Sequence, residues 1–233
     1  MKTRISSLAI LCLALASAPA WAGNDSGCRG PDCGGWWVPW AYNNGPINGT
    51  TDAWTINYGY IVSDTFETVD TWQDQYVSGF AFAVWEFPGD KMSSVQWSVT
   101  SGENGGTMYG SGVASSANLV DQFLSSNQYG YDMDLITVSG LNLHIPYGTY
   151  WLNLQNAAVP SGDPVYWDEN SGQGCRSSGC PSEASQSAVG TIPSEALTVN
   201  GYYFVPESGS FMLFGSGVLA VAGRLRRRLR FWS

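Results

Sequence analysis

Short runs of β-branched and aromatic residues, each closed by turn residues, follow one another along most of this chain, and none has long helical periodicity. Such residues favour strands over helices. Many strands at this spacing are typical of an antiparallel β-sandwich, so the sequence predicts an all-β fold. The predicted strands are 54–62, 65–69, 76–87, 94–99, 107–114, 135–145, 149–155, 165–167 and 197–204.

The run 76–87 differs from its neighbours because apolar residues occupy both of its alternating sets of positions. Successive side chains of a strand point to opposite faces, so this pattern predicts a strand that is buried on both sides or lies at a sheet junction. Pro88 and Gly89 then predict a tight turn, and residues 146–148 predict a hairpin between the strands on either side.

The N-terminus carries the features of an export signal. Lys2 and Arg4 precede an apolar run at 8–16, and Ala20 and Ala22 supply a small-x-small cleavage pattern. An apolar core of about nine residues is too short to span a bilayer. We therefore expect a signal peptide at 1–22, removed after Ala22.

The C-terminus reads as a second targeting segment. Val205, Pro206 and Glu207 precede an uncharged apolar stretch at 211–223. At about 1.5 Å per residue, a helix over 204–223 would span roughly 30 Å, the thickness of a hydrocarbon core. An arginine cluster follows, and its positive charge favours a cytoplasmic position for this end. The cluster consists of Arg224, Arg226, Arg227, Arg228 and Arg230.

This order of motif, apolar helix and arginine cluster resembles the PEP-CTERM sorting signal of Gram-negative bacteria, which the membrane protease exosortase processes. The resemblance implies that the tail, residues 205–230, consists of the motif, a transmembrane helix and the arginine cluster, and that it holds the protein in the inner membrane as an intermediate. An exosortase-like protease would then pass the protein to the cell surface or the extracellular exopolysaccharide matrix. The family usually has proline after the glutamate, where this chain has Ser208. The alternative is an ordinary tail anchor with a stop-transfer cluster.

The segments WEFPGD, GTYWLNLQNA and DPVYWDEN also resemble stretches of the β-sandwich payloads of PEP-CTERM proteins, which look jelly-roll-like. The resemblance implies a single jelly-roll-like antiparallel sandwich, which we place at 51–204. Residues 23–50, rich in Gly, Asn, Cys and Trp, are expected to form an irregular lead-in segment rather than a second domain.

Charge excludes one class of partner. Between the two targeting segments the chain keeps three basic and 18 acidic residues, which gives a net charge of −15. Binding of nucleic acid requires basic patches, so we expect no nucleic-acid partner. Such a surface is compatible with high solubility, with divalent cations and with neutral polysaccharides.

Four cysteines remain after removal of the signal peptide: Cys28, Cys33, Cys175 and Cys180. An even number in an exported chain predicts disulfide bonds. Two local loops and a staple between the two pairs are both compatible with the spacing. A zinc site is disfavoured, because structural zinc pairs more often have two residues between the cysteines.

Residues for catalysis are few. The single histidine, His144, lies in a predicted strand without a serine nucleophile motif nearby. Two carboxylates in a cleft would suffice for a glycan-acting enzyme, and Asp132 with Asp134 or Asp168 with Glu169 are the candidates. These carboxylates are better explained as solvent-exposed acids on turns. We therefore expect that the protein is not an enzyme.

Two binding sites are suggested by residue type. Asp163 and Asp168 lie in an oxygen-rich loop and could serve as calcium ligands, although no EF-hand pattern is present; otherwise we expect no cofactor. Nine tryptophans lie between the targeting segments, and exposed rings can stack on sugars. The candidates for carbohydrate binding are Trp36, Trp37, Trp40 and Trp167, with core packing as the alternative.

Together these features predict an exported surface or matrix protein with a structural or adhesive, non-enzymatic role. The first alternative is a lectin-like carbohydrate-binding module, and the second is a glycan-acting enzyme. Exopolysaccharide is the expected partner outside the membrane.

Overall fold

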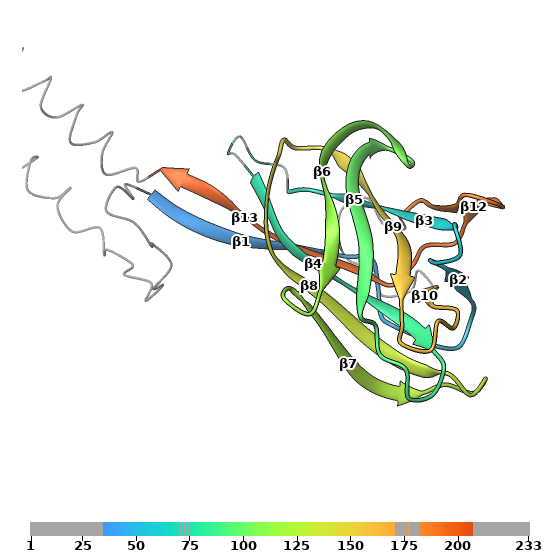
Figure 1. The fold of residues 1–233 in the computed structure, drawn as a ribbon. Coiled ribbons are helices and arrows are strands. Elements are labelled where there is room, and N and C mark those ends of the chain that lie inside the picture. Colours follow the sequence, from blue (N-terminus) through green and yellow to red (C-terminus); the bar gives the residue numbers. More distant parts are fainter. Residues whose placement is uncertain are drawn as a thin grey trace, which may run out of the picture. The chain divides into compact units, whose positions relative to one another are not determined.

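The computed structural model describes residues 35–69, 71, 73, 75–170, 177 and 182–206, and all structural statements concern these residues. They form antiparallel strands in two sheets, consistent with a β-sandwich (Figure 1). No helix among them has the length and apolar character needed to span a bilayer. The all-β prediction is therefore confirmed.

The first sheet is organised around a long central strand, β4. One edge of β4 pairs with β13 and, further along, with β10, while the other edge pairs with β8. The outer strands β1, β2 and β7 then pair with β13, β10 and β8. The strands of this sheet are β1 (Gly35–Asn43), β2 (Ala53–Thr55), β4 (Gln75–Glu86), β7 (Leu119–Ser126), β8 (Asp132–Ile145), β10 (Tyr166–Asp168) and β13 (Leu197–Pro206).

The second sheet has the order β12-β11-β3-β9-β5-β6. Its inner face supplies buried residues such as Phe66, Leu152 and Leu154, which join Phe80 and Phe82 of β4 in one hydrophobic core. The core between the sheets is thus built from the apolar halves of alternating strands. The strands of this sheet are β3 (Ile61–Glu67), β5 (Ser94–Gly102), β6 (Gly105–Ser115), β9 (Thr149–Ala158), β11 (Ala184–Gln186) and β12 (Gly190–Ile192).

Strand β4 is buried on both faces, as its sequence predicts. Phe80 and Phe82 lie in the core between the sheets, whereas Ala83 and Trp85 belong to a second, smaller cluster with Met133. The turn predicted after β4 is also present, because the backbone N–H of Asp90 donates to the carbonyl of Phe87.

Three local predictions are wrong. The lead-in expected to be irregular over 23–50 contains β1, which pairs along its whole length with β13. The predicted run 54–62 is two strands, because the chain turns at Tyr58 and Gly59, both at positive φ. Residues 146–148 close no hairpin: β8 belongs to the first sheet and β9 to the second, so this turn connects the sheets.

The sorting motif begins inside the last strand rather than after it. β13 continues through Val205 and Pro206, which pair with Trp36 and Gly35 of β1. Several predicted features lie outside the described residues: the signal peptide 1–22, all four cysteines, Glu207, the apolar stretch 211–223 and the arginine cluster.

Candidate functional site

Aromatic side chains gather on the outer side of the first sheet, across β1, β13 and β4. We call Trp37, Tyr76, Tyr202 and Phe204 the aromatic face. Residues paired across an antiparallel ladder project from the same side of the sheet. Tyr76 pairs with Tyr202, and Trp37 pairs with Phe204 two positions further along β13. The register of three strands therefore brings these four rings together.

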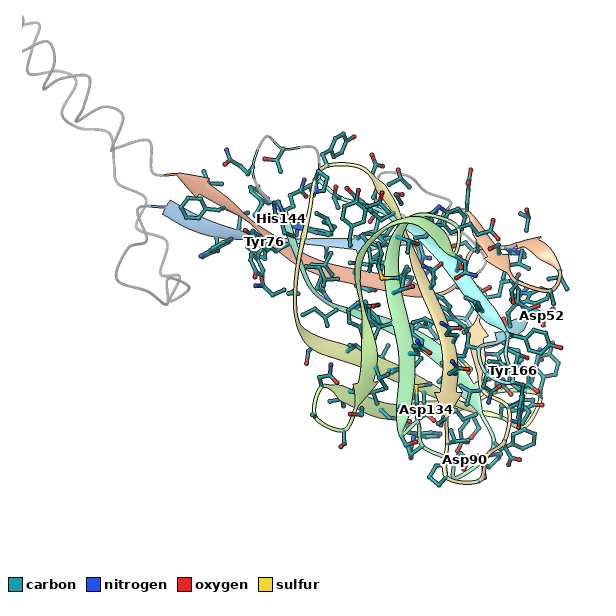
Figure 2. All side chains as sticks on the ribbon, turned by 45° about the horizontal axis from the view of Figure 1, so that its top comes forward. Asp52, Tyr76, Asp90, Asp134, His144 and Tyr166 are labelled. Atoms are coloured by element: carbon teal, nitrogen blue, oxygen red, sulfur yellow. The ribbon has the colours of Figure 1, made fainter. Side chains whose placement is uncertain are left out.

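The neighbouring positions show that this side faces solvent. Trp40, Val77 and Val199, which have the opposite orientation on the same strands, are buried in the core. Trp37 is 39% exposed, and Tyr76 and Tyr202 are partly exposed. His144 of β8 pairs with Tyr76 and extends the row to a fourth strand, as Figure 2 shows for the two labelled residues.

The rings support one another in defined geometries. Tyr76 and Tyr202 are stacked, with centroids 5.3 Å apart and planes inclined by 14°. Trp37 meets Tyr202 edge-on at 4.8 Å and Phe204 at 5.2 Å. Each such pair contributes about 0.5–1.5 kcal/mol beyond the area that it buries. The face is thus preformed, because its rings hold one another in place.

Polar groups border these rings. The hydroxyl of Tyr202 donates to Oδ1 of Asn142 at 2.6 Å, and the imidazole of His144 lies 5.2 Å from the Tyr76 ring. Burial, and then the neighbouring Tyr76, raise the pKa of Tyr202 above its ordinary value. Flat apolar rings beside hydroxyl, amide and imidazole groups match the alternating apolar and polar surfaces of a sugar.

The structure separates the four tryptophans that we selected from the sequence. Trp37 lies on the aromatic face, and the side chain of Trp36 is outside the described residues. Trp167 is 0% exposed, donates through its indole N–H to the carbonyl of Ala196 and packs edge-on against Phe82. Trp40 is also buried in the core. The prediction of carbohydrate binding is therefore wrong for Trp40 and Trp167, which fill the core.

Sequence reasoning missed Tyr76, Tyr202 and Phe204 as members of this face. Tyr202 and Phe204 do alternate within the predicted strand 197–204, which is the period of one strand face. Their connection with Trp37 could not be found without β1, a strand that the sequence did not predict.

Asp168, one of the two predicted calcium ligands, is engaged by the protein itself. Its carboxylate accepts hydrogen bonds from the indole of Trp85 at 2.7 Å and from the backbone N–H groups of Gly49 and Asn48 at 3.0 and 3.1 Å. Burial raises the pKa of Asp168 to about 6. These contacts fasten the loop before β2 onto β10, which is a structural role.

Asp163 lies in the loop before β10, where its backbone carbonyl accepts from the side-chain amide of Asn57. Within the described chain, the carboxylates that converge closely enough for a shared cation are a different set: Glu86, Asp121 and Asp134. Neither Asp163 nor Asp168 belongs to it.

The carboxylates considered for glycan hydrolysis also have other partners in the structure. Asp132 accepts from the backbone N–H of Gly89 and from the hydroxyl of Ser126, while Glu169 accepts from the indole of Trp54. Asp134 binds Lys91.

No protein-family model and no curated protein sequence matches this chain.

Proposed function

We propose that this chain is an exported, non-enzymatic β-sandwich that attaches to polysaccharide of the cell surface or extracellular matrix through its aromatic face. The observation that carries the proposal is the exposed Trp37, held edge-on against Tyr202 beside the Tyr202–Asn142 hydrogen bond. Large exposed apolar groups rimmed by polar ones mark binding surfaces.

The ligand class follows from the charge. The chain between the targeting segments carries a net charge of −15, which repels polyanions. Neutral glycans avoid this repulsion and offer the C–H faces that stack on aromatic rings. A neutral exopolysaccharide is thus the proposed ligand, and the protein's role is adhesive.

The delivery route rests on the two ends of the sequence. The signal peptide exports the chain, and the tail places it in the inner membrane until an exosortase-like protease acts near Pro206 and Glu207. Cleavage there would leave nearly all of β13 in the product, because Pro206 is the last residue of that strand. The aromatic face would therefore survive processing.

Affinity electrophoresis tests the proposed binding. The full chain, purified in mild detergent, is run through gels that contain the exopolysaccharide of the producing cells or a neutral glucan. We expect retardation of the wild type and an affinity at least about tenfold lower for Trp37→Ala, which corresponds to about 1.4 kcal/mol. Tyr60→Ala is the matched control, since Tyr60 is 40% exposed at another place in the fold.

Two results would oppose the proposal. One is the absence of retardation in every polysaccharide. The other is equal retardation of the wild type and Trp37→Ala, which would show that the polysaccharide binds to another surface of the protein.

Intact mass spectrometry of the protein recovered from the cell surface tests the delivery route separately. A C-terminus near Pro206 or Glu207 supports processing. A mass that includes the arginine cluster would reduce the tail to a plain anchor, and it would leave the binding proposal untouched.

A further inference from the structure

Three carboxylates from three strands converge at one end of the first sheet. Glu86 is the last residue of β4, Asp134 lies near the start of β8, and Asp121 lies in β7. One oxygen of each lies within 4.8 Å of the others. Figure 2 shows Asp134 at the end of the sheet where the β4–β5 connection with Asp90 also lies. We call these three acids the acidic cluster.

Strand register explains the convergence. Asp134 pairs with Val84, two residues before Glu86, and Asp121 pairs with Ile136, two residues after Asp134. Residues two apart share a face of a strand. All three acids therefore project from the same side of the sheet as the core residues Val84 and Ile136.

One cation of the chain faces this cluster. The ammonium of Lys91 lies 2.6 Å from Oδ1 of Asp134 and 3.0 Å from Oδ1 of Asp121. The backbone N–H of Met92 donates to the other oxygen of Asp121 at 2.6 Å. Asp121 is thus well satisfied, but one ammonium faces three carboxylates.

Glu86 is a buried acid without a hydrogen-bond partner among the described residues. Glu86 is 0% exposed, and within the described part of the chain neither of its carboxylate oxygens accepts a hydrogen bond. Oδ2 of the equally buried Asp134 also lacks a partner among these residues. Burial of unpaired polar oxygens costs several kcal/mol. The ion pairs of Lys91 with Asp121 and Asp134 do not explain why the side chain of Glu86 also lies in this cluster.

We propose that Glu86, Asp121 and Asp134 bind a calcium ion and that Lys91 occupies the site as an internal competitor until the ion displaces it. Calcium takes oxygen ligands at about 2.3–2.6 Å, so two ligands on opposite sides of the ion lie up to about 5.2 Å apart. The spacing of the cluster fits this limit, and the unpartnered oxygens of Glu86 and Asp134 become ligands. Water and backbone carbonyls complete the coordination.

Lys91 has room to leave. Its side chain is 46% exposed, and its ammonium already lies 5.7 Å from the centre of the Phe123 ring at the rim of the cluster. A cation above an aromatic ring is attracted to the negative face of the ring, also at an exposed position. The displaced lysine therefore keeps a contact at the surface.

Competition between calcium and the ammonium of Lys91 sets the calcium affinity of the site. Extracellular calcium modules commonly have dissociation constants of about 10⁻⁴ to 10⁻³ M, and a site with a resident ammonium belongs in that range. Removal of the ammonium should tighten binding, whereas removal of a ligand should weaken it. A purely structural ion pair predicts no calcium binding by the wild type, because Lys91 then stays bound to Asp121 and Asp134.

Calorimetric titration of the full chain with calcium chloride, after treatment with EDTA, tests the site. We expect one ion per chain for the wild type, at least tenfold tighter binding for Lys91→Met and no binding at this site for Glu86→Gln. Magnesium, which demands smaller octahedral geometry, should bind more weakly than calcium. Asp163→Asn is the matched control and should bind as the wild type does.

The folded state of each variant is checked by near-ultraviolet circular dichroism. Unchanged or weaker binding by Lys91→Met would overturn the proposal, as would the absence of binding by folded wild type. Loss of binding in Asp163→Asn, with binding retained in Glu86→Gln, would also overturn it and move the site to the loop before β10.

Discussion

Replacement of Glu86 by glutamine isolates the energetic effect of one buried charge. The substitution keeps the shape of the side chain and breaks no hydrogen bond, because the Glu86 oxygens accept none. Burial, and then the charges of Asp121 and Asp134, raise the pKa of Glu86 from 4.5 to about 8. The native state therefore holds this proton more tightly than the unfolded chain does.

The sign and size of the effect follow from linkage. Between about pH 4.5 and 8 the unfolded glutamate is ionised while the native one is protonated, so this group lowers the stability of the fold as pH rises. The difference between these two pKa values sets a ceiling of about 5 kcal/mol. Water reaches the rim of the cluster beside Lys91, whose side chain is 46% exposed, so we expect about 2–3 kcal/mol.

Urea unfolding in EDTA, followed by tryptophan fluorescence, measures this difference. Near pH 4, below the unfolded pKa, the wild type and Glu86→Gln should have nearly equal free energies of unfolding, and near pH 9 the variant should be more stable by about 2–3 kcal/mol. Asp64 and Glu195, whose pKa values are also raised by burial, titrate in both proteins and cancel in the comparison. A variant that is equally or less stable near pH 9 would refute the reasoning.

Three substitutions test other parts of the fold. Trp167→Ala empties a fully buried position and should cost about 3–5 kcal/mol in urea unfolding; a loss under 1 kcal/mol would contradict its place in the core. Gly201→Ala would place a methyl group against the indole of Trp40, so we expect a melting temperature lower by several degrees, and no change would argue against this packing. Asp168→Ala leaves the buried indole N–H of Trp85 and two backbone N–H groups without their acceptor, which should cost about 2–4 kcal/mol, whereas unchanged unfolding would show that these bonds contribute little.

Patterns within one strand could be predicted from the sequence. The double alternation over 76–87 predicts burial on both faces of β4, because side-chain direction in a strand depends only on position. The tight turn at Pro88 and Gly89 is equally local. These features need no knowledge of which strands are neighbours.

Strand β1 was missed for a physical reason. Glycines and Pro39 argue against a strand. Among the described strands, however, β1 pairs with β13 alone, and an edge strand tolerates proline because one row of its N–H groups needs no ladder partner. Trp167 was misplaced for a related reason: β10 is only three residues long, yet β2 and β4 flank it on both sides and bury its ring.

The acidic cluster and the aromatic face were beyond sequence reasoning. Glu86 and Asp121 are far apart along the chain and meet only because β8 lies between β4 and β7 in a specific register. The sequence pairs Asp134 with Asp132, which lies on the same strand, as candidate catalytic carboxylates, because a sequence shows only the spacing of residues within a strand.

The pairing of β1 with β13 also has a mechanical consequence. Tyr202 and Phe204 lie within the last five residues of β13, and Trp37 lies opposite Phe204. In the proposed membrane-held intermediate, before the tail is removed, tension on a ligand bound at the aromatic face would pass to the anchor along these few residues. The remainder of the sandwich would bear almost none of the load, so the grip on the ligand would depend on the shear resistance of the β13 ladders rather than on the global stability of the fold.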